Sequence, residues 1–135
     1  MRVLSALALV VALTACGDKA TEPLVTPLPG VWSLHSINGT PLPFVVARSG
    51  ADKMELTGDV FTVAAGGRFT QVTTMRTTIN GQATTQVTPD AGNYTLTGNA
   101  VVFQFDSDGM TGTAALTATA LTVTGNGIVA VYTNE

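Results

Sequence analysis

The stretch Ala100-Val101-Val102-Phe103-Gln104-Phe105 carries the clearest strand pattern of the chain. Val101, Phe103 and Phe105 fall on one side of an extended backbone. Gln104 falls on the other side. Alternation of this kind is typical of a β-strand with one buried face and one solvated face. The stretch therefore predicts an apolar core built from sheet.

The same alternation recurs through residues 30–135. Threonine and valine are frequent there, and these β-branched residues favour strands, whereas helix-forming stretches are nearly absent. The other alternating segments contain Trp32 and Leu34; Phe61 and Val63; Phe69, Thr73, Met75 and Ile79; Tyr94 and Leu96; Leu121 and Val123; and a final run from Ile128 to Tyr132. We expect each segment to be one strand, of about five to eight residues in most cases and longer where Phe69, Thr73, Met75 and Ile79 line one face.

Turn signals separate these segments at short intervals. They include Asn38-Gly39, Gly66-Gly67, Asn80-Gly81, Gly98-Asn99, Asp108-Gly109 and Gly125-Asn126-Gly127. Asn-Gly and Asp-Gly pairs tolerate the positive φ angles of tight hairpins. The sequence therefore predicts an all-β fold, namely a small antiparallel up-and-down barrel of about eight strands, with a β-sandwich as the alternative.

The stretch 113–124 is rich in alanine and leucine and is ambiguous between helix and strand. Its threonines recur nearly every second residue, and its apolar phase switches near Ala120. A hairpin or a bulge explains that switch better than a helix does.

The first residues have the pattern of an export signal. Arg2 supplies a positive charge, and residues 3–13 are apolar except for one serine. This run is shorter than the ~20 apolar residues that a helix needs to span a bilayer. We expect residues 1–15 to be a signal peptide that is removed.

Leu13-Thr14-Ala15-Cys16 resembles the lipobox of bacterial lipoproteins. The resemblance implies that Cys16 is lipidated and anchors the chain to a membrane of the cell envelope. The alternative is an ordinary secretory signal with a stray cysteine. In such lipoproteins an Asp directly after the lipidated cysteine commonly retains the protein in the inner membrane. Here Gly17 follows Cys16 and the Asp is one place later, at Asp18. The resemblance therefore favours the outer membrane, facing the periplasm, over the inner membrane. The cell surface also stays open.

Residues 16–29 form an expected spacer between this anchor and the folded part. Pro23, Pro27 and Pro29 favour extended backbone and prevent regular helix. The last few spacer residues either remain extended or pack along the domain. Residues 30–135 are then expected to form a single β-barrel domain.

The opening of that domain resembles small lipocalin-like barrels. The residues that carry the resemblance are Gly30-Val31-Trp32, Leu34, the Asn38-Gly39 hairpin and Pro41-Leu42-Pro43. The resemblance implies a barrel with Trp32 at its closed end and a small apolar ligand at its mouth. Trp32, Phe69, Phe103 and Phe105 are the candidate residues for the ligand or core lining. A filled barrel and a barrel with a cavity both remain open.

The sequence shows no catalytic constellation, and we expect neither an enzyme nor a cofactor. His35 is the one histidine of the chain. Asp106-Ser107-Asp108-Gly109 resembles the start of a calcium loop, but Thr117 stands where such a loop has its terminal Glu, so a polar turn without metal is favoured. A net charge of −3 and a charged fraction of 11% argue against nucleic acid as a partner.

Two functional interpretations follow. The first is a non-enzymatic envelope lipoprotein, attached to the membrane through its N-terminal lipid, that binds a small hydrophobic ligand. The second is a filled barrel that serves as a structural or interaction module and docks an envelope protein, for example as an inhibitor or an assembly accessory.

Overall fold

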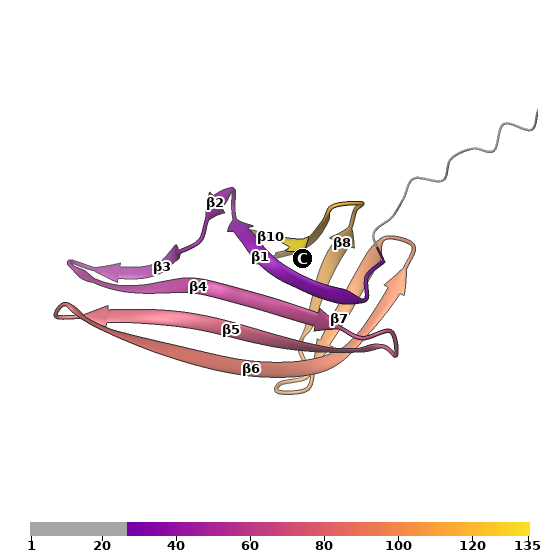
Figure 1. The fold of residues 1–135 in the computed structure, drawn as a ribbon, viewed down its shortest axis with the longest axis horizontal. Helices are drawn as coiled ribbons and strands as arrows, with labels where there is room; N and C mark the ends of the chain where they lie inside the picture. Colours follow the sequence, from indigo (N-terminus) through magenta and orange to yellow (C-terminus); the bar gives the residue numbers. More distant parts are fainter. Residues whose placement is uncertain (1–26) are drawn as a thin grey trace, which may run out of the picture.

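The computed structural model describes residues 27–135, which form an all-β fold (Figure 1). Its ten strands are β1 (Gly30–Ile37), β2 (Thr40–Pro41), β3 (Phe44–Ser49), β4 (Asp52–Val63), β5 (Arg68–Ile79), β6 (Gln82–Thr97), β7 (Ala100–Phe105), β8 (Thr111–Leu116), β9 (Ala120–Gly125) and β10 (Ile128–Asn134). The expected signal peptide, Cys16 and the spacer up to residue 26 lie outside the described residues. Residues 27–135 contain no helix that is long and apolar enough to cross a bilayer.

Eight of these strands close into an antiparallel barrel. Strands β4 to β10 pair consecutively, and β1 closes the ring by pairing with β10 on one side and with β4 on the other. The β4 contact joins residues 30–33 to residues 60–63, and β2 and β3 remain outside the ring. The predicted barrel is confirmed, and the sandwich alternative is wrong because a sandwich has no such closing seam.

The ambiguous stretch 113–124 is a hairpin. Leu116 and Leu121 are the last paired residues of β8 and β9, and Thr117 closes the turn between them. The hydroxyl of Thr117 also accepts hydrogen bonds from the backbone N–H groups of Thr119 and Ala120. Because Leu116 and Leu121 face each other across this turn and both are buried, the apolar phase switches between the two strands near Ala120.

Apolar side chains fill the interior of the barrel around Trp32. The fully covered residues include Trp32, Phe69, Phe103, Leu121 and Val101, which are predicted inward residues of the Trp32 segment and of three further strands. The indole N–H of Trp32 donates to the carbonyl oxygen of Leu28 at 2.8 Å, and Leu28 is itself buried. Leu28 therefore packs along the domain and belongs to its core.

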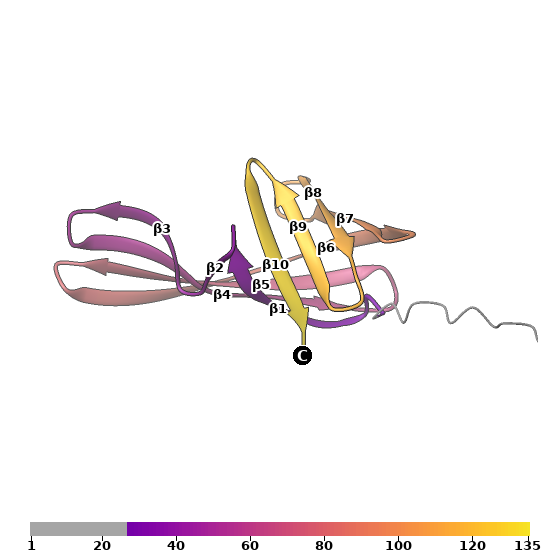
Figure 2. The same ribbon diagram turned by 90° about the horizontal axis from the view of Figure 1, so that it is seen from above.

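Three strands are much longer than five to eight residues, and one of them, β5, is the long strand that the sequence predicted. β4 and β5 have 12 residues each and β6 has 16. Their excess length, together with β3, extends away from the barrel as a single sheet layer (Figures 1 and 2). We call this layer the wing and define it as β3 with residues 52–57, 74–79 and 82–89. All of residues 82–89 are exposed.

Candidate ligand-binding site at the barrel mouth

Three of the four candidate lining residues lie inside the packed core. Trp32, Phe69 and Phe103 are at most 1% exposed, whereas Phe105 is half-buried. The ring centroids of Phe69 lie 4.9 Å from those of Phe103 and 5.2 Å from those of Phe105, both edge to face. These rings pack against each other at favourable aromatic distances. A ligand can therefore reach Phe105 but not the other three without disturbing the core.

A buried carboxylate lies next to this group of aromatic rings. Asp59 of β4 accepts hydrogen bonds from the hydroxyl of Tyr132 at 2.6 Å, the amide of Gln71 at 2.7 Å and the hydroxyl of Thr73 at 3.0 Å. Tyr132 comes from β10, two strands away around the ring, and its ring packs edge-on against Phe61. The cluster thus links β4 and β5 to β10 across the intervening strand β1.

Burial decides the protonation of this cluster. Loss of hydration raises the pKa of Asp59 above its usual range, although the donors Tyr132, Gln71 and Thr73 oppose that change. Burial, followed by the nearby carboxylate, raises the pKa of Tyr132, so its hydroxyl stays protonated and donates. Within residues 27–135 no buried side-chain polar atom lacks a partner. The Asp59 cluster is therefore a saturated structural layer.

An open hollow of about 540 Å³ is lined by the ends of β8, β9 and β10 and by the residues beside them. Buried Ala114, Leu121 and Tyr132 fix which positions of these strands point inward. The lining positions in the inward phase are Met110, Gly112, Val123, Gly125, Ile128 and Ala130, and the hollow is also lined by Thr111, Thr113, Thr124 and Asn126. We call this hollow the mouth of the barrel.

Small residues create the hollow. Gly112, Gly125 and Ala130 have little or no side chain, whereas leucine side chains and aromatic rings fill the adjoining core. A Cβ added to Gly112 would meet one atom, Cε2 of Phe105, at 3.8 Å, which is ordinary contact distance. Met110 and Ile128 are 63% and 47% exposed and supply apolar surface at the rim. The site can thus accept an apolar group next to Phe105.

A second hollow, of about 260 Å³, lies at the end of the wing. Its lining includes Met54 and Ile79, but also the charged side chains of Arg48, Asp52 and Lys53. It is separated from the barrel interior by the length of the wing (Figure 1). The mouth hollow is the larger of the two, adjoins the core and has no charged side chain in its lining, so it is the better candidate for an apolar ligand.

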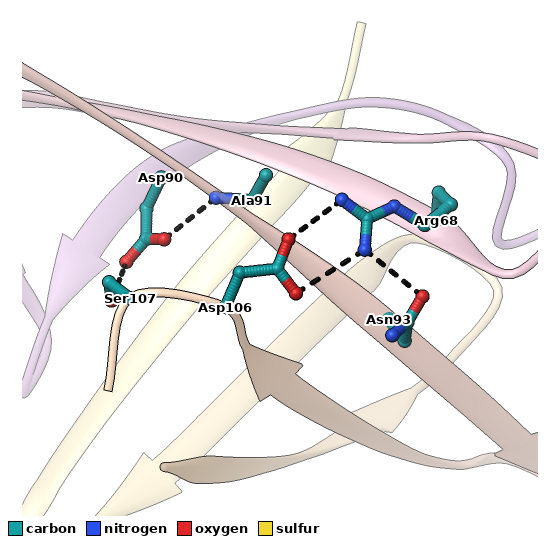
Figure 3. A network of polar contacts seen from close by, with 6 residues as sticks. All are labelled: Arg68, Asp90, Ala91, Asn93, Asp106 and Ser107. Carbon is teal, nitrogen blue, oxygen red and sulfur yellow. Dashed lines mark hydrogen bonds and ion pairs between the residues drawn. The ribbon is translucent and has the colours of Figure 1, made fainter. Parts of the chain in front are cut away.

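The calcium-like residues form a polar turn between β7 and β8. Both carboxylate oxygens of Asp106 accept hydrogen bonds from Arg68, at 2.8 and 3.3 Å (Figure 3). Asp108 accepts the backbone N–H of Met110 at 2.8 Å. Residues 27–135 hold no group of three or more His, Cys, Asp or Glu side chains arranged for a metal ion. His35 is exposed on the outer face of β1.

Sequence reasoning missed both the hollow and the buried carboxylate. Gly112 is two residues before inward Ala114, and Gly125 is two residues after inward Val123. Glycine at two inward positions was the available sign that the interior is not filled there. Asp59 gave no such signal, because a charged residue two places before Phe61 is normally exposed.

Comparisons with known proteins show a likeness of fold to a solved structure. No protein-family model and no curated protein match the chain. Among solved structures, the chain is similar to a lipocalin-like protein from Bacteroides uniformis, with 14% sequence identity and a TM-score of 0.45. The likeness covers 80% of this chain and 98% of that protein.

Proposed function

We propose that this protein is a non-enzymatic, lipid-anchored envelope protein that binds a small hydrophobic ligand at the mouth of its barrel. The observation that carries the proposal is the hollow of about 540 Å³. Its lining positions in the inward phase are Met110, Gly112, Val123, Gly125, Ile128 and Ala130, beside Thr111, Thr113, Thr124 and Asn126. Ligand pockets usually measure roughly 300–1,000 Å³ and are mostly apolar. Burying apolar ligand surface there is favourable by about 25 cal/mol per Å².

The state of the acidic groups supports a non-enzymatic role. Lys53 and Arg76 hold the Glu55 carboxylate at 2.9 and 2.8 Å and lower its pKa, and Arg68 does the same for Asp106. Asp59 is saturated by its neighbours. A general acid or base needs a proton that a substrate can reach, and these contacts occupy the three carboxylates.

Leucine at position 112 tests the ligand site. The side chain of Gly112→Leu would fill the hollow without backbone strain, and we expect at least about tenfold weaker binding of the uncharged dye N-phenyl-1-naphthylamine, or ~1.4 kcal/mol. The matched control is Ala115→Leu, which places the same side chain on the exposed outer face of β8, outside the hollow. Dye titration followed by fluorescence measures both. Equal affinity of both variants and the native chain would place the dye elsewhere and refute the site.

The anchor is tested separately. The support for it is the Leu13–Cys16 lipobox and the proline-containing spacer. Cys16→Ser should move the protein from the membrane fraction of producing cells to the soluble fraction, because the residue can no longer carry lipid. A variant that stays on the membrane would contradict lipid anchoring, whatever the result at Gly112.

A further inference from the structure

One side of β6 is open over the length of the wing. β6 pairs with β5 from Gln82 to Asn93, but it pairs with β7 only from Gly92 to Thr97. Residues 82–89 therefore form an exposed strand edge (Figure 1). Such an edge is a template for pairing with another strand.

The hairpin at Asn80-Gly81 determines which backbone groups face this open edge. Both residues have positive φ, 50° and 77°, as a two-residue type I′ turn requires. The turn is closed by a hydrogen-bonded pair, Ile79 and Gln82, and hydrogen-bonded pairs then alternate along the two strands. The N–H and C=O groups of Ala83, Thr85 and Val87 consequently point away from β5, toward the open edge.

Both ends of the open edge are defined. Pro89 is the next residue in the same alternation, and it has no N–H to offer. Ala91 follows, and both of its backbone groups are already used. Its N–H donates to the carboxylate of Asp90 (Figure 3). Its C=O accepts the N–H of Asp106. The open edge thus presents three complete backbone pairs between the Asn80-Gly81 turn and Pro89.

This set of groups is self-complementary. In an antiparallel pair of two copies centred on Thr85, Thr85 faces its own equivalent and Ala83 faces Val87 of the second copy. All three N–H groups and their three C=O partners are then used. A centre displaced toward the barrel would bring Pro89 into a donor position, and a centre displaced toward the turn would leave Val87 opposite the hairpin loop.

The other edge of the wing is protected, and this edge is not. β3 carries a bulge between Val45 and Ala47, and Arg48 lies opposite Lys53, so a second copy would meet a bent strand with positive charge. Bulges and charges are the usual means of blunting an edge. Residues 82–89 of β6 contain no charged side chain and no bulge against β5. Two copies can approach there without like-charge repulsion.

We propose that two copies of this chain associate through their β6 edges, antiparallel and centred on Thr85. The two wings then form one continuous sheet, with the barrels at opposite ends. This interface involves neither the barrel mouth nor Cys16, so it stands apart from the proposed ligand site.

Cross-linking of Thr85→Cys in the full-length chain tests the pairing. Residues facing each other in a hydrogen-bonded antiparallel pair have Cα atoms about 5.5 Å apart, within the range of a disulfide. Oxidation of membranes from producing cells with copper phenanthroline should give a reducible covalent dimer. The parent chain, with Cys16 as its one cysteine, and Thr95→Cys, which lies where β6 pairs with Val102 of β7, should give none.

A charge variant provides the second readout. Thr85→Lys places two like charges face to face across the axis, so the dimer mass in light scattering of the detergent-solubilised protein should be lost, whereas Thr95→Lys should keep it. A monomeric native chain, or no cross-link at position 85, overturns the proposal. A cross-link from position 85 to a different protein overturns it as well and assigns the edge to an envelope partner.

Discussion

At the scale of single residues, Gly92 is the position with the least freedom in the barrel. A Cβ there would overlap the carbonyl oxygen of Gln104 and lie 2.7 Å from Cε1 of Phe69. Glycine at such a point permits close approach of backbone and ring where β6 enters the barrel. We expect Gly92→Ala to lower the free energy of unfolding by at least about 3 kcal/mol in chemical denaturation.

The control for that variant is Gly112→Ala. Its Cβ would meet Phe105 at 3.8 Å, an ordinary contact, so its stability should stay within about 1 kcal/mol of the native chain. Similar losses in the two variants would show that the tight approach at Gly92 is not the cause.

Asp59 gives a prediction about pH. Burial raises the pKa of Asp59 in the folded chain above the usual 3.8. Between the unfolded and the folded pKa of Asp59, the folded state therefore binds more protons than the unfolded state. The free energy of unfolding therefore falls as pH rises from the unfolded pKa to the folded pKa, and this contribution is constant above that value. Asp59→Asn cannot titrate and lacks this contribution.

Urea unfolding of the native chain and of Asp59→Asn at a series of pH values measures the contribution of Asp59 to the free energy of unfolding. The stability of the native chain relative to Asp59→Asn should decrease with rising pH and then level off. The pKa values of Glu55 and Asp106 are lowered, so these groups act in the opposite direction, but they are common to both chains and cancel in the difference. Parallel pH profiles would contradict a raised pKa for Asp59.

At the scale of elements, local pattern predicted the strands and turns and the long strand β5, but not the length of β6. Val101 and Phe103 alternate with solvated neighbours, and Asn80-Gly81 specifies its hairpin, because both signals depend on adjacent residues. Residues 82–89 of the wing carry threonine on both faces, with glutamine on one face and alanine on the other. That composition resembles a loop as much as a strand, so the extension of β6 beyond the barrel gave no distinct signal.

At the scale of the whole molecule, closure of the ring is a nonlocal property. β1 pairs with β10 near the other end of the domain and also with residues 60–63 of β4. Gly30 and Trp32 predicted a barrel only through a resemblance, because nothing in their own neighbourhood encodes partners so distant in sequence. The mouth hollow depends on the same closure, which curves β8 to β10 around the small residues Gly112 and Ala130.

The barrel and the wing should be separable, and a shortened chain tests this. Replacing residues 76–85 with Asn-Gly joins Met75 to Gln86, a hydrogen-bonded pair in the alternation set by Ile79 and Gln82. The new hairpin reproduces the native Asn-Gly-Gln turn. Because the barrel core lies outside the deleted part, we expect native fluorescence of buried Trp32 and unchanged dye binding, together with loss of the dimer, since Ala83 and Thr85 are gone.

A second deletion provides the control for strand register. Replacing residues 77–84 with Asn-Gly joins Arg76 to Thr85, which is a pair without mutual hydrogen bonds and cannot close a two-residue type I′ turn. This longer variant should therefore be less stable to urea than the shorter one, by about 1 kcal/mol or more. Loss of native Trp32 fluorescence in the shorter variant would show that the wing is part of the barrel's folding unit. A dimer that survives in it would refute pairing through β6 and leave the ligand site at the mouth unaffected.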